Sequence, residues 1–217
     1  MKIINPEKPV LLVSAGVVHP TLSARRRFHT IVHQDALVSA TVTSRVENLT
    51  LLDGGGFEGV ILYFHRRQIT DGALGALDRF VSGGGGLLAV HGASASFKKT
   101  PRYFDILGGR FVSHGPVGSY TVRRTAAAFS AFGVMEPLAV TDELYIHEYG
   151  KDVTVHFSTD TDRGPEPVVW TRRHGKGRVC YVSLGHVAAV MNDRAVRRIM
   201  ADGLLWTLGH QREGKDA

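Results

Sequence analysis

The sequence contains a single cysteine, Cys180, among its 217 residues. One thiol excludes a disulfide within the chain and any zinc site built from several cysteines. Long apolar runs are also missing: none approaches the ~18 residues that a membrane-spanning helix requires, so we expect no membrane partner. The amino-terminal segment MKIINPEKPV lacks the apolar core and cleavage site of a signal peptide, and this predicts a cytoplasmic protein.

Aromatic residues are scarce, at 8% of the chain, and they do not alternate with the basic residues. The formal net charge of +6 raises nucleic acid as a partner, but a surface for single-stranded nucleic acid also needs aromatic rings on which bases stack. The paired arginines are spread over the whole chain, which is typical of a solvated surface. We therefore expect no nucleic-acid partner.

The remaining composition is that of an ordinary globular protein, with 43% hydrophobic and 21% charged residues. The chain has no internal repeat and no low-complexity linker. A chain of 217 residues can bury a full core as one domain. We therefore predict a single domain over residues 1–217.

Short apolar runs between glycine or proline residues predict buried strands at residues 9–14, 59–64, 87–90 and 178–184, with a further strand at 40–46. Apolar residues at helical spacing predict a helix over 24–39 capped by Ser23, a helix from Asp71 to the glycines at 83–86, and a last helix capped by Asn192 or Asp193. Alternating strands and helices indicate an α/β fold, with a mostly parallel sheet flanked by helices on both faces. The parallel inner strands are expected at residues 11–13, 60–62, 87–90 and 179–182.

The middle of the chain is less regular. We expect a short helix over 101–107, and a hairpin whose strands, 167–173 and 178–184, flank the turn signal HGKG. Residues 110–114 lead into a strand at 118–124, and further strands are expected at 138–140 and 153–158, with residues 141–145 between them.

Four histidines, His19, His65, His91 and His186, lie at or shortly after the carboxyl ends of predicted strands. Parallel strands gather such residues on the rim where open α/β sheets bind their ligands. Gathered imidazoles suit proton transfer near neutral pH, or binding of a divalent transition metal. His91 is the centre of this pattern because small residues follow it and let the chain turn sharply, whereas His65 is the member most typical of a surface loop.

Five sequence blocks together resemble the ThuA-like proteins, a family named for trehalose utilisation. The blocks are GGGLLAVHGA, GGRFVSHGPV, DELY, PVVWTRRHGKGRV and YVSLGH, and they occur in the family's order between about residue 9 and residue 210. The resemblance implies a class I glutamine-amidotransferase-like fold of the flavodoxin-like type, and a role in sugar catabolism.

The resemblance also implies that His91 occupies the turn where amidotransferases place their nucleophilic cysteine, and that His186 occupies the place of their catalytic histidine. Where those enzymes have an acidic partner two residues later, this chain has Ala188. The only cysteine lies inside an expected strand, so no thiolate activated by a histidine is available. The chain also has Pro20 and Val187 where the family often has aspartate. We therefore expect no glutaminase activity.

The expected pocket combines the strand-end histidines with residues from the middle of the chain. Its members are His19, His91, His114, Glu143 and His186, with Tyr145 beside them. We expect His91, His186 and Glu143 to be catalytic, and His19, His114 and Tyr145 to bind substrate. His19, His91 and His186 are also candidate ligands for a divalent metal such as zinc.

Two members of this pocket have a second interpretation. Glu143 is either a base or metal ligand, with Asp142 as a neighbour that caps or orders the loop, or it is an exposed turn carboxylate. Tyr145 is either a ring on which a sugar stacks or part of the core.

The histidine rim and the implied link to sugar breakdown lead to a hypothesis about the reaction. A sugar oxidised to a ketone at carbon 3 has an acidified hydrogen at carbon 2, which a base of near-neutral pKa can remove. We therefore expect a lyase, hydrolase or isomerase of 3-keto glycosides, with a small-molecule carbohydrate as its partner. The alternative is a non-catalytic sugar-binding or regulatory partner of a sugar oxidoreductase. Residues 126–134 offer a contact for a homo-oligomer, although a buried helix or loop explains them equally well.

Overall fold

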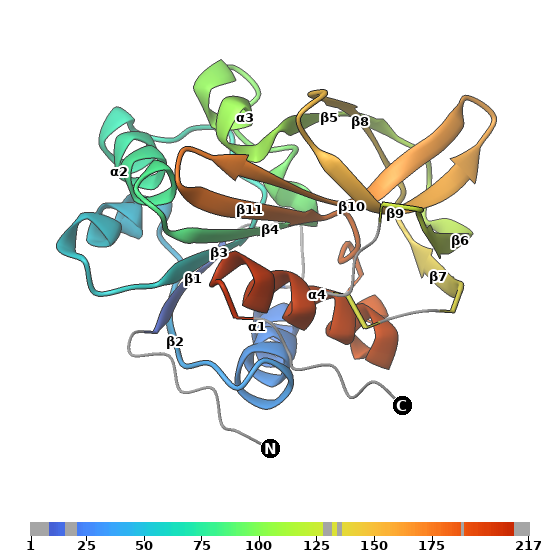
Figure 1. Cartoon of the computed structure of the whole chain (residues 1–217), viewed down its shortest axis with the longest axis horizontal. Coiled ribbons are helices and arrows are strands. Elements are labelled where there is room, and N and C mark those ends of the chain that lie inside the picture. Colours follow the sequence, from blue (N-terminus) through green and yellow to red (C-terminus); the bar gives the residue numbers. More distant parts are fainter. Residues whose placement is uncertain (1–8, 16–20, 128–131, 134–135, 188, 211–217) are drawn as a thin grey trace.

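The computed structural model of the chain describes residues 9–15, 21–127, 132–133, 136–187 and 189–210. These residues form one α/β domain built around a large sheet (Figure 1). His19 and much of the segment 126–134 lie outside the described residues, so the structure does not place the expected first-loop ligand or the expected oligomer contact.

The sheet contains nine strands: β1 (Val10–Ala15), β2 (Ala40–Thr43), β3 (Gly59–Phe64), β4 (Gly86–Val90), β6 (Gly118–Arg124), β7 (Leu138–Asp142), β9 (Thr154–Thr161), β10 (Gly164–His174) and β11 (Gly177–Val182). Their order is β2-β1-β3-β4-β11-β10-β9-β6-β7. The first five are parallel to one another, and this order is that of flavodoxin-like folds. The last four extend the sheet in antiparallel pairs. The predicted class, a mostly parallel sheet in an α/β fold, is confirmed.

Helices cover both faces of the sheet (Figure 1). One face carries α1 (Thr21–His29), the π-helix η1 (Thr30–Asp35) and α4 (Arg194–Thr207), and the other carries the 3-10 helix η2 (Val46–Gly54), α2 (Asp71–Ser82) and α3 (Pro101–Leu107). Each face has its own buried apolar cluster, with Phe28 and Ile199 in the first and Leu77 and Ile106 in the second. Every residue of β1, β3 and β4 is buried between these layers, which explains why these strands are near-continuous apolar runs.

A separate antiparallel ribbon of two strands, β5 (Gly109–His114) and β8 (Tyr145–Tyr149), lies outside the large sheet. It pairs His114 with Tyr145 at one end and Gly109 with Tyr149 at the other. The short 3-10 helix η3 (His91–Ala93) follows β4, and a second one, η4 (Val190–Asn192), precedes α4. The ribbon and η3 together bring the middle of the chain to the rim of the sheet.

The inner strands are parallel as predicted, and α3 spans the predicted residues 101–107. Asp193 caps α4 by accepting the amide proton of Ala195 at 2.7 Å, which confirms one of the two expected caps. The start of the first helix was predicted wrongly. Helix α1 begins at Thr21, so Ser23 lies inside the helix, and the preceding Pro20 favours a helix start at this point.

Further boundaries differ from the prediction. The first helical segment ends with η1 at Asp35 and not at residue 39. β2 ends at Thr43 and not at residue 46, because the Thr43 hydroxyl accepts from the amide of Arg45 at 3.2 Å and from Asn48 at 2.9 Å. Such a side-chain turn diverts the backbone from the sheet. The expected connection over 141–145 is also mostly strand, since it contains the end of β7 and the start of β8. No helix among the described residues is long and apolar enough to cross a membrane.

Candidate active site

The candidate site is built on a sharp turn at the end of β4, where the chain passes through His91 into η3. His91 has φ +45°, in the left-handed region that residues other than glycine rarely adopt. Such a conformation costs about 1–3 kcal/mol and persists only where the surrounding structure holds it. The next three residues, Gly92, Ala93 and Ser94, are buried and small, so the chain can pack closely at this turn.

A backbone carbonyl orients the His91 imidazole. Nδ1 of His91 lies 2.8 Å from the carbonyl oxygen of Ser183. Because a carbonyl oxygen can only accept, Nδ1 carries the proton of this bond. Nε2 is the nitrogen directed toward His186. The His91 side chain is 0% exposed, so its position is fixed by packing as well as by this bond.

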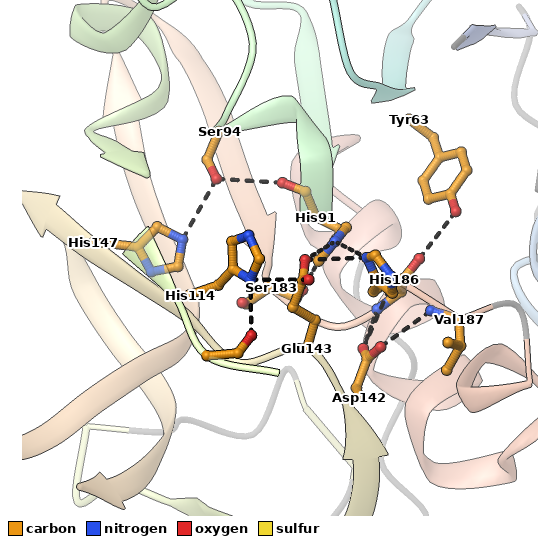
Figure 2. A network of polar contacts seen from close by, with 12 residues as sticks. Tyr63, His91, Ser94, His114, Asp142, Glu143, His147, Ser183, His186 and Val187 are labelled. Atoms are coloured by element: carbon orange, nitrogen blue, oxygen red, sulfur yellow. Dashed lines mark hydrogen bonds and ion pairs between the residues drawn. The ribbon is translucent and has the colours of Figure 1, made fainter. Parts of the chain in front are cut away.

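Three side chains, those of His91, Glu143 and His186, meet at the site (Figure 2). Nε2 of His91 lies 3.3 Å from Nδ1 of His186 and 3.7 Å from Oε2 of Glu143. Nδ1 of His186 lies 3.1 Å from the same carboxylate oxygen. The other oxygen, Oε1, lies 3.0 Å from Nδ1 of His114. One carboxylate therefore contacts three imidazoles.

These side chains come from four separate segments. Glu143 lies between β7 and β8, His114 ends β5, and His186 follows β11. Glu143 is 8% exposed, so it is not an exposed turn carboxylate. The side chains of His186 and His114 are 25% and 45% exposed. The site thus has a buried floor, formed by His91 and Glu143, and two histidines that a ligand can reach.

Asp142 holds the loop that carries His186. Its Oδ2 accepts the amide protons of Gly185 at 2.7 Å and of His186 at 3.4 Å, and its Oδ1 accepts that of Val187 at 3.1 Å. The Tyr63 hydroxyl donates to the carbonyl of Gly185 at 2.9 Å. Burial raises the pKa of the Asp142 carboxyl, and the amides oppose that shift because they stabilise the charged form. These bonds agree with the interpretation of Asp142 as a loop-ordering residue.

Tyr145 packs against the imidazole of His91. Its buried ring is 4.1 Å from the ring of His91 and 4.5 Å from that of Phe111, centroid to centroid. Burial raises the pKa of its phenol. Little of the ring is left for a sugar to stack on, which agrees with the interpretation of Tyr145 as a core residue.

Among the described residues, the strand-end histidine His65 is not part of this cluster. His65 follows β3, is half-buried, and bonds to the backbone at Ala95. Burial lowers its pKa, and the charges of Lys98 and Arg67 lower it further. His19 lies outside the described residues, so its expected role stays a prediction.

The three donor atoms of His91, Glu143 and His186 fit a small tetrahedral metal ion. Zinc bound by nitrogen and oxygen at about 2.0–2.2 Å places neighbouring ligand atoms about 3.3–3.6 Å apart. The separations here are 3.1, 3.3 and 3.7 Å. Metal-binding histidines usually donate their second ring N–H to a carbonyl or carboxylate, as His91 does. Two histidines and one glutamate also leave a fourth position open, as in catalytic zinc sites.

One histidine beside the site was missed in the sequence. His147 lies on β8 and is buried, with Nδ1 2.9 Å from Oε1 of Glu166 and Nε2 3.1 Å from the hydroxyl of Tyr181. The available signal was alternation, because side chains two apart on a strand share one face. Tyr145 and His147 are both buried on that face of β8.

Comparisons with known proteins agree with this fold. A sequence model of the trehalose utilisation (ThuA) family matches residues 9–207, whereas no curated protein sequence matches the chain. A ThuA-like protein from Parabacteroides merdae superposes with a TM-score of 0.82 at 17% identity, over 95% of this chain and 93% of that one. A ThuA-like protein from Bacteroides uniformis superposes with a TM-score of 0.77 at 17% identity, over 96% of each chain.

A part of a larger protein also has this fold. The β-galactosidase of Rahnella sp. R3 superposes with a TM-score of 0.67 at 14% identity, over 95% of this chain but only 32% of that one. Likeness at such low identity concerns the fold alone. The family match, in contrast, extends over most of the sequence, and the protein therefore belongs to the trehalose utilisation (ThuA) family.

Proposed function

We propose that this protein is an enzyme of sugar metabolism that acts on 3-keto glycosides by proton transfer at carbon 2. Membership of the ThuA family supports a sugar-related role. The observation that carries the proposal is the contact of one buried carboxylate, Glu143, with the imidazoles of His91, His114 and His186. The expectations of a carbohydrate ligand and a cytoplasmic location are part of this proposal.

The chemistry demands a base and a place for negative charge. A ketone at carbon 3 acidifies the hydrogen at carbon 2, because the carbanion formed on its removal delocalises onto the carbonyl oxygen. A base of near-neutral pKa can take this proton. The enolate oxygen then needs hydrogen-bond donors or a positive charge. Once the enolate has formed, the group on carbon 1 can leave, or the proton can return to the opposite face.

The arrangement of the histidines suggests how these roles divide. We assign proton abstraction to His186, because it is the partly exposed member of the buried cluster and its Nδ1 lies 3.1 Å from the carboxylate of Glu143. A carboxylate at that nitrogen orients the imidazole and stabilises the imidazolium that forms. The buried His91 orients His186, since its Nε2 lies 3.3 Å from Nδ1 of that residue. His114, the most exposed of the three, binds sugar hydroxyls and the developing enolate oxygen.

A metal ion is compatible with the same residues. Zinc held by His91, Glu143 and His186 would supply a Lewis acid for the keto oxygen. His114 would then be the titratable residue of the cluster that remains available for proton transfer. The metal therefore changes the assignment of the base and leaves the expected substrate class the same.

The same site argues against glutamine hydrolysis. His91 stands at the turn where an amidotransferase needs a thiol, and Cys180 is fully buried within β11. Burial raises the pKa of that thiol, which disfavours the thiolate that attacks an amide.

The proposal is tested by incubating the protein with a 3-keto-disaccharide and measuring its cleavage or isomerisation by chromatography. We expect His186→Ala to lower kcat by about a hundredfold or more, since general acid–base catalysis contributes about 10²–10⁴-fold. His91→Ala should cause a comparable loss, because it removes the side chain that contacts Nδ1 of His186. His29→Ala, on the exposed side of α1, is the control and leaves the rate unchanged. A protein that binds the sugar by calorimetry but converts no keto-sugar would instead be the non-catalytic partner of a sugar oxidoreductase.

A further inference from the structure

A second polar network contacts the turn at His91. The proposed reaction does not use it. It contains Ser94, Tyr181, His147 and Glu166, all of them buried. Oε1 of Glu166 accepts both the backbone N–H of His147 at 3.1 Å and its ring Nδ1–H at 2.9 Å. The Tyr181 hydroxyl lies 3.1 Å from Nε2 of His147 and 2.8 Å from Oγ of Ser94.

The hydrogen bonds of this network run in one direction. Because Nδ1 of His147 donates to a carboxylate, Nε2 of the neutral ring accepts, and the Tyr181 hydroxyl is placed to donate to it. The Tyr181 oxygen can then accept from Oγ of Ser94 at 2.8 Å, and the same Oγ lies 3.3 Å from the carbonyl oxygen of His91. Burial lowers the pKa of His147 and so favours this neutral ring, although Glu166 acts in the opposite direction. Each of the four side chains therefore has a polar partner within the network, as buried polar groups require.

A serine, a histidine and a carboxylate in one network also make up the triad of serine hydrolases. The geometry here, however, does not fit a nucleophilic serine. Ser94 is 0% exposed, and its Oγ lies 3.4 Å from Nε2 of His147, farther than from the intervening Tyr181 hydroxyl. A nucleophile needs a base within about 2.6–3.2 Å and access to substrate. The network must therefore serve the candidate site in another way.

The network connects two halves of the candidate site. One half, with His91 and His186, follows strands of the large sheet, whereas His114 and Tyr145 belong to the β5–β8 ribbon. His147 is a ribbon residue that bonds to side chains of the large sheet, Glu166 of β10 and Tyr181 of β11.

Ser94 joins the ribbon to the turn. Its carbonyl accepts the amide proton of Phe111 from β5 at 3.1 Å, and its amide donates to the carbonyl of His91 at 3.1 Å. The Tyr181 hydroxyl also lies 3.1 Å from that carbonyl, and its one proton is shared between this oxygen and Nε2 of His147. Figure 2 shows the contacts of Ser94 with both His91 and His147. The backbone of His91, in its strained conformation, is thus tied to the ribbon through Ser94 and Tyr181.

We propose that Ser94, Tyr181, His147 and Glu166 form a positioning network that sets the ribbon half of the active site against the sheet half. The network holds His91 in its left-handed conformation and keeps the ring of Tyr145 against its imidazole. None of the four residues contacts substrate. The kinetic part of the test rests on the proposed function, and the spectroscopic part does not.

The kinetic test uses two variants that remove one hydroxyl each, Tyr181→Phe and Ser94→Ala. We expect each to lower kcat for the 3-keto-disaccharide by about 10–100-fold, the usual effect of removing a residue that orients a functional histidine, with KM changed by less than about threefold. The double variant should be no more than about threefold worse than the poorer single variant, since residues that act as a unit are not additive. Thr171→Val removes a buried hydroxyl 2.7 Å from the remote His156 and is the matched control, with unchanged kcat.

Rescue and spectroscopy separate positioning from stability. Glu166→Gln keeps an oxygen that can accept from His147, so its kcat should stay within about fivefold of wild type, whereas Glu166→Ala should lose about as much as Tyr181→Phe. At fixed pH, Tyr181→Phe should also shift the imidazole proton resonances of His91, which lie next to the Tyr145 ring. Thr171→Val should leave those resonances in place.

Two results would overturn the positioning role. One is a multiplicative loss of kcat in the double variant, and the other is an unchanged His91 spectrum in folded Tyr181→Phe. If the wild-type protein converts no keto-sugar, the proposed function fails while the spectra still decide this inference.

Discussion

Replacing Asp142 by asparagine tests how the structure holds the loop that carries His186, the proposed base. The carboxylate accepts amide protons on both oxygens, at 2.7 Å from Gly185 and 3.1 Å from Val187. Asparagine keeps one acceptor oxygen and presents an NH₂ group to the other amide. At least one buried donor then loses its partner, which costs about 1–3 kcal/mol. The loop that carries His186 is consequently released on one side.

We therefore expect Asp142→Asn to lower the free energy of unfolding by about 1–3 kcal/mol, measured by urea denaturation with tryptophan fluorescence and linear extrapolation. It should also lower kcat for the 3-keto-disaccharide. Asp160→Asn is the matched control, because that side chain is 85% exposed, and exposed substitutions stay within about 0.5 kcal/mol. If Asp142→Asn unfolds at the same urea concentration as wild type and keeps full activity, the carboxylate does not hold the loop.

The remaining predictions concern the thiol, the metal and acid stability. Cys180 should stay unreactive toward a thiol reagent until the protein is unfolded, and glutamine should release no ammonia; release that Cys180→Ala abolishes would contradict the site assignment. Calorimetry should detect one zinc ion per chain, and Glu143→Gln should weaken its binding by at least about tenfold; a protein that binds no zinc would leave the histidines as acid–base groups only. Burial lowers the pKa of His156 from 6.5 to about 4, so the folded protein binds fewer protons there than the unfolded chain between these values. The free energy of unfolding should therefore fall by up to about 3 kcal/mol as the pH drops from about 6.5 to about 4, and His156→Leu should flatten that dependence; equal slopes in both proteins would refute the assignment.

The sheet core was predictable because its residues are apolar on both sides. β1, β3 and β4 are buried along their whole length, so their sequences could be recognised without knowledge of their partners. Parallel pairing then placed His91 and His186 at the same rim, and the structure puts their rings 3.3 Å apart at the nearest nitrogens.

The ribbon was harder to predict because its pairing is not local. β8 contains His147 and Glu148 among its five residues and pairs with β5, more than thirty residues earlier in the chain. Its inward face is held by polar contacts to Glu166 and Tyr181, which no periodicity of apolar residues reveals. The role of His147 therefore depends on tertiary contacts, and the same holds for the three amides bound by Asp142.

Solvent deuterium exchange tests the central claim most directly. The protein is incubated with a 3-keto-disaccharide in deuterated water, and incorporation at carbon 2 is followed by mass spectrometry or NMR. The account predicts exchange or cleavage by the wild-type protein, and a loss of about a hundredfold or more in His186→Ala, since that residue takes the proton. Exchange at the wild-type rate in both His186→Ala and His91→Ala, or no exchange by the wild-type protein with any keto-sugar tried, would contradict it.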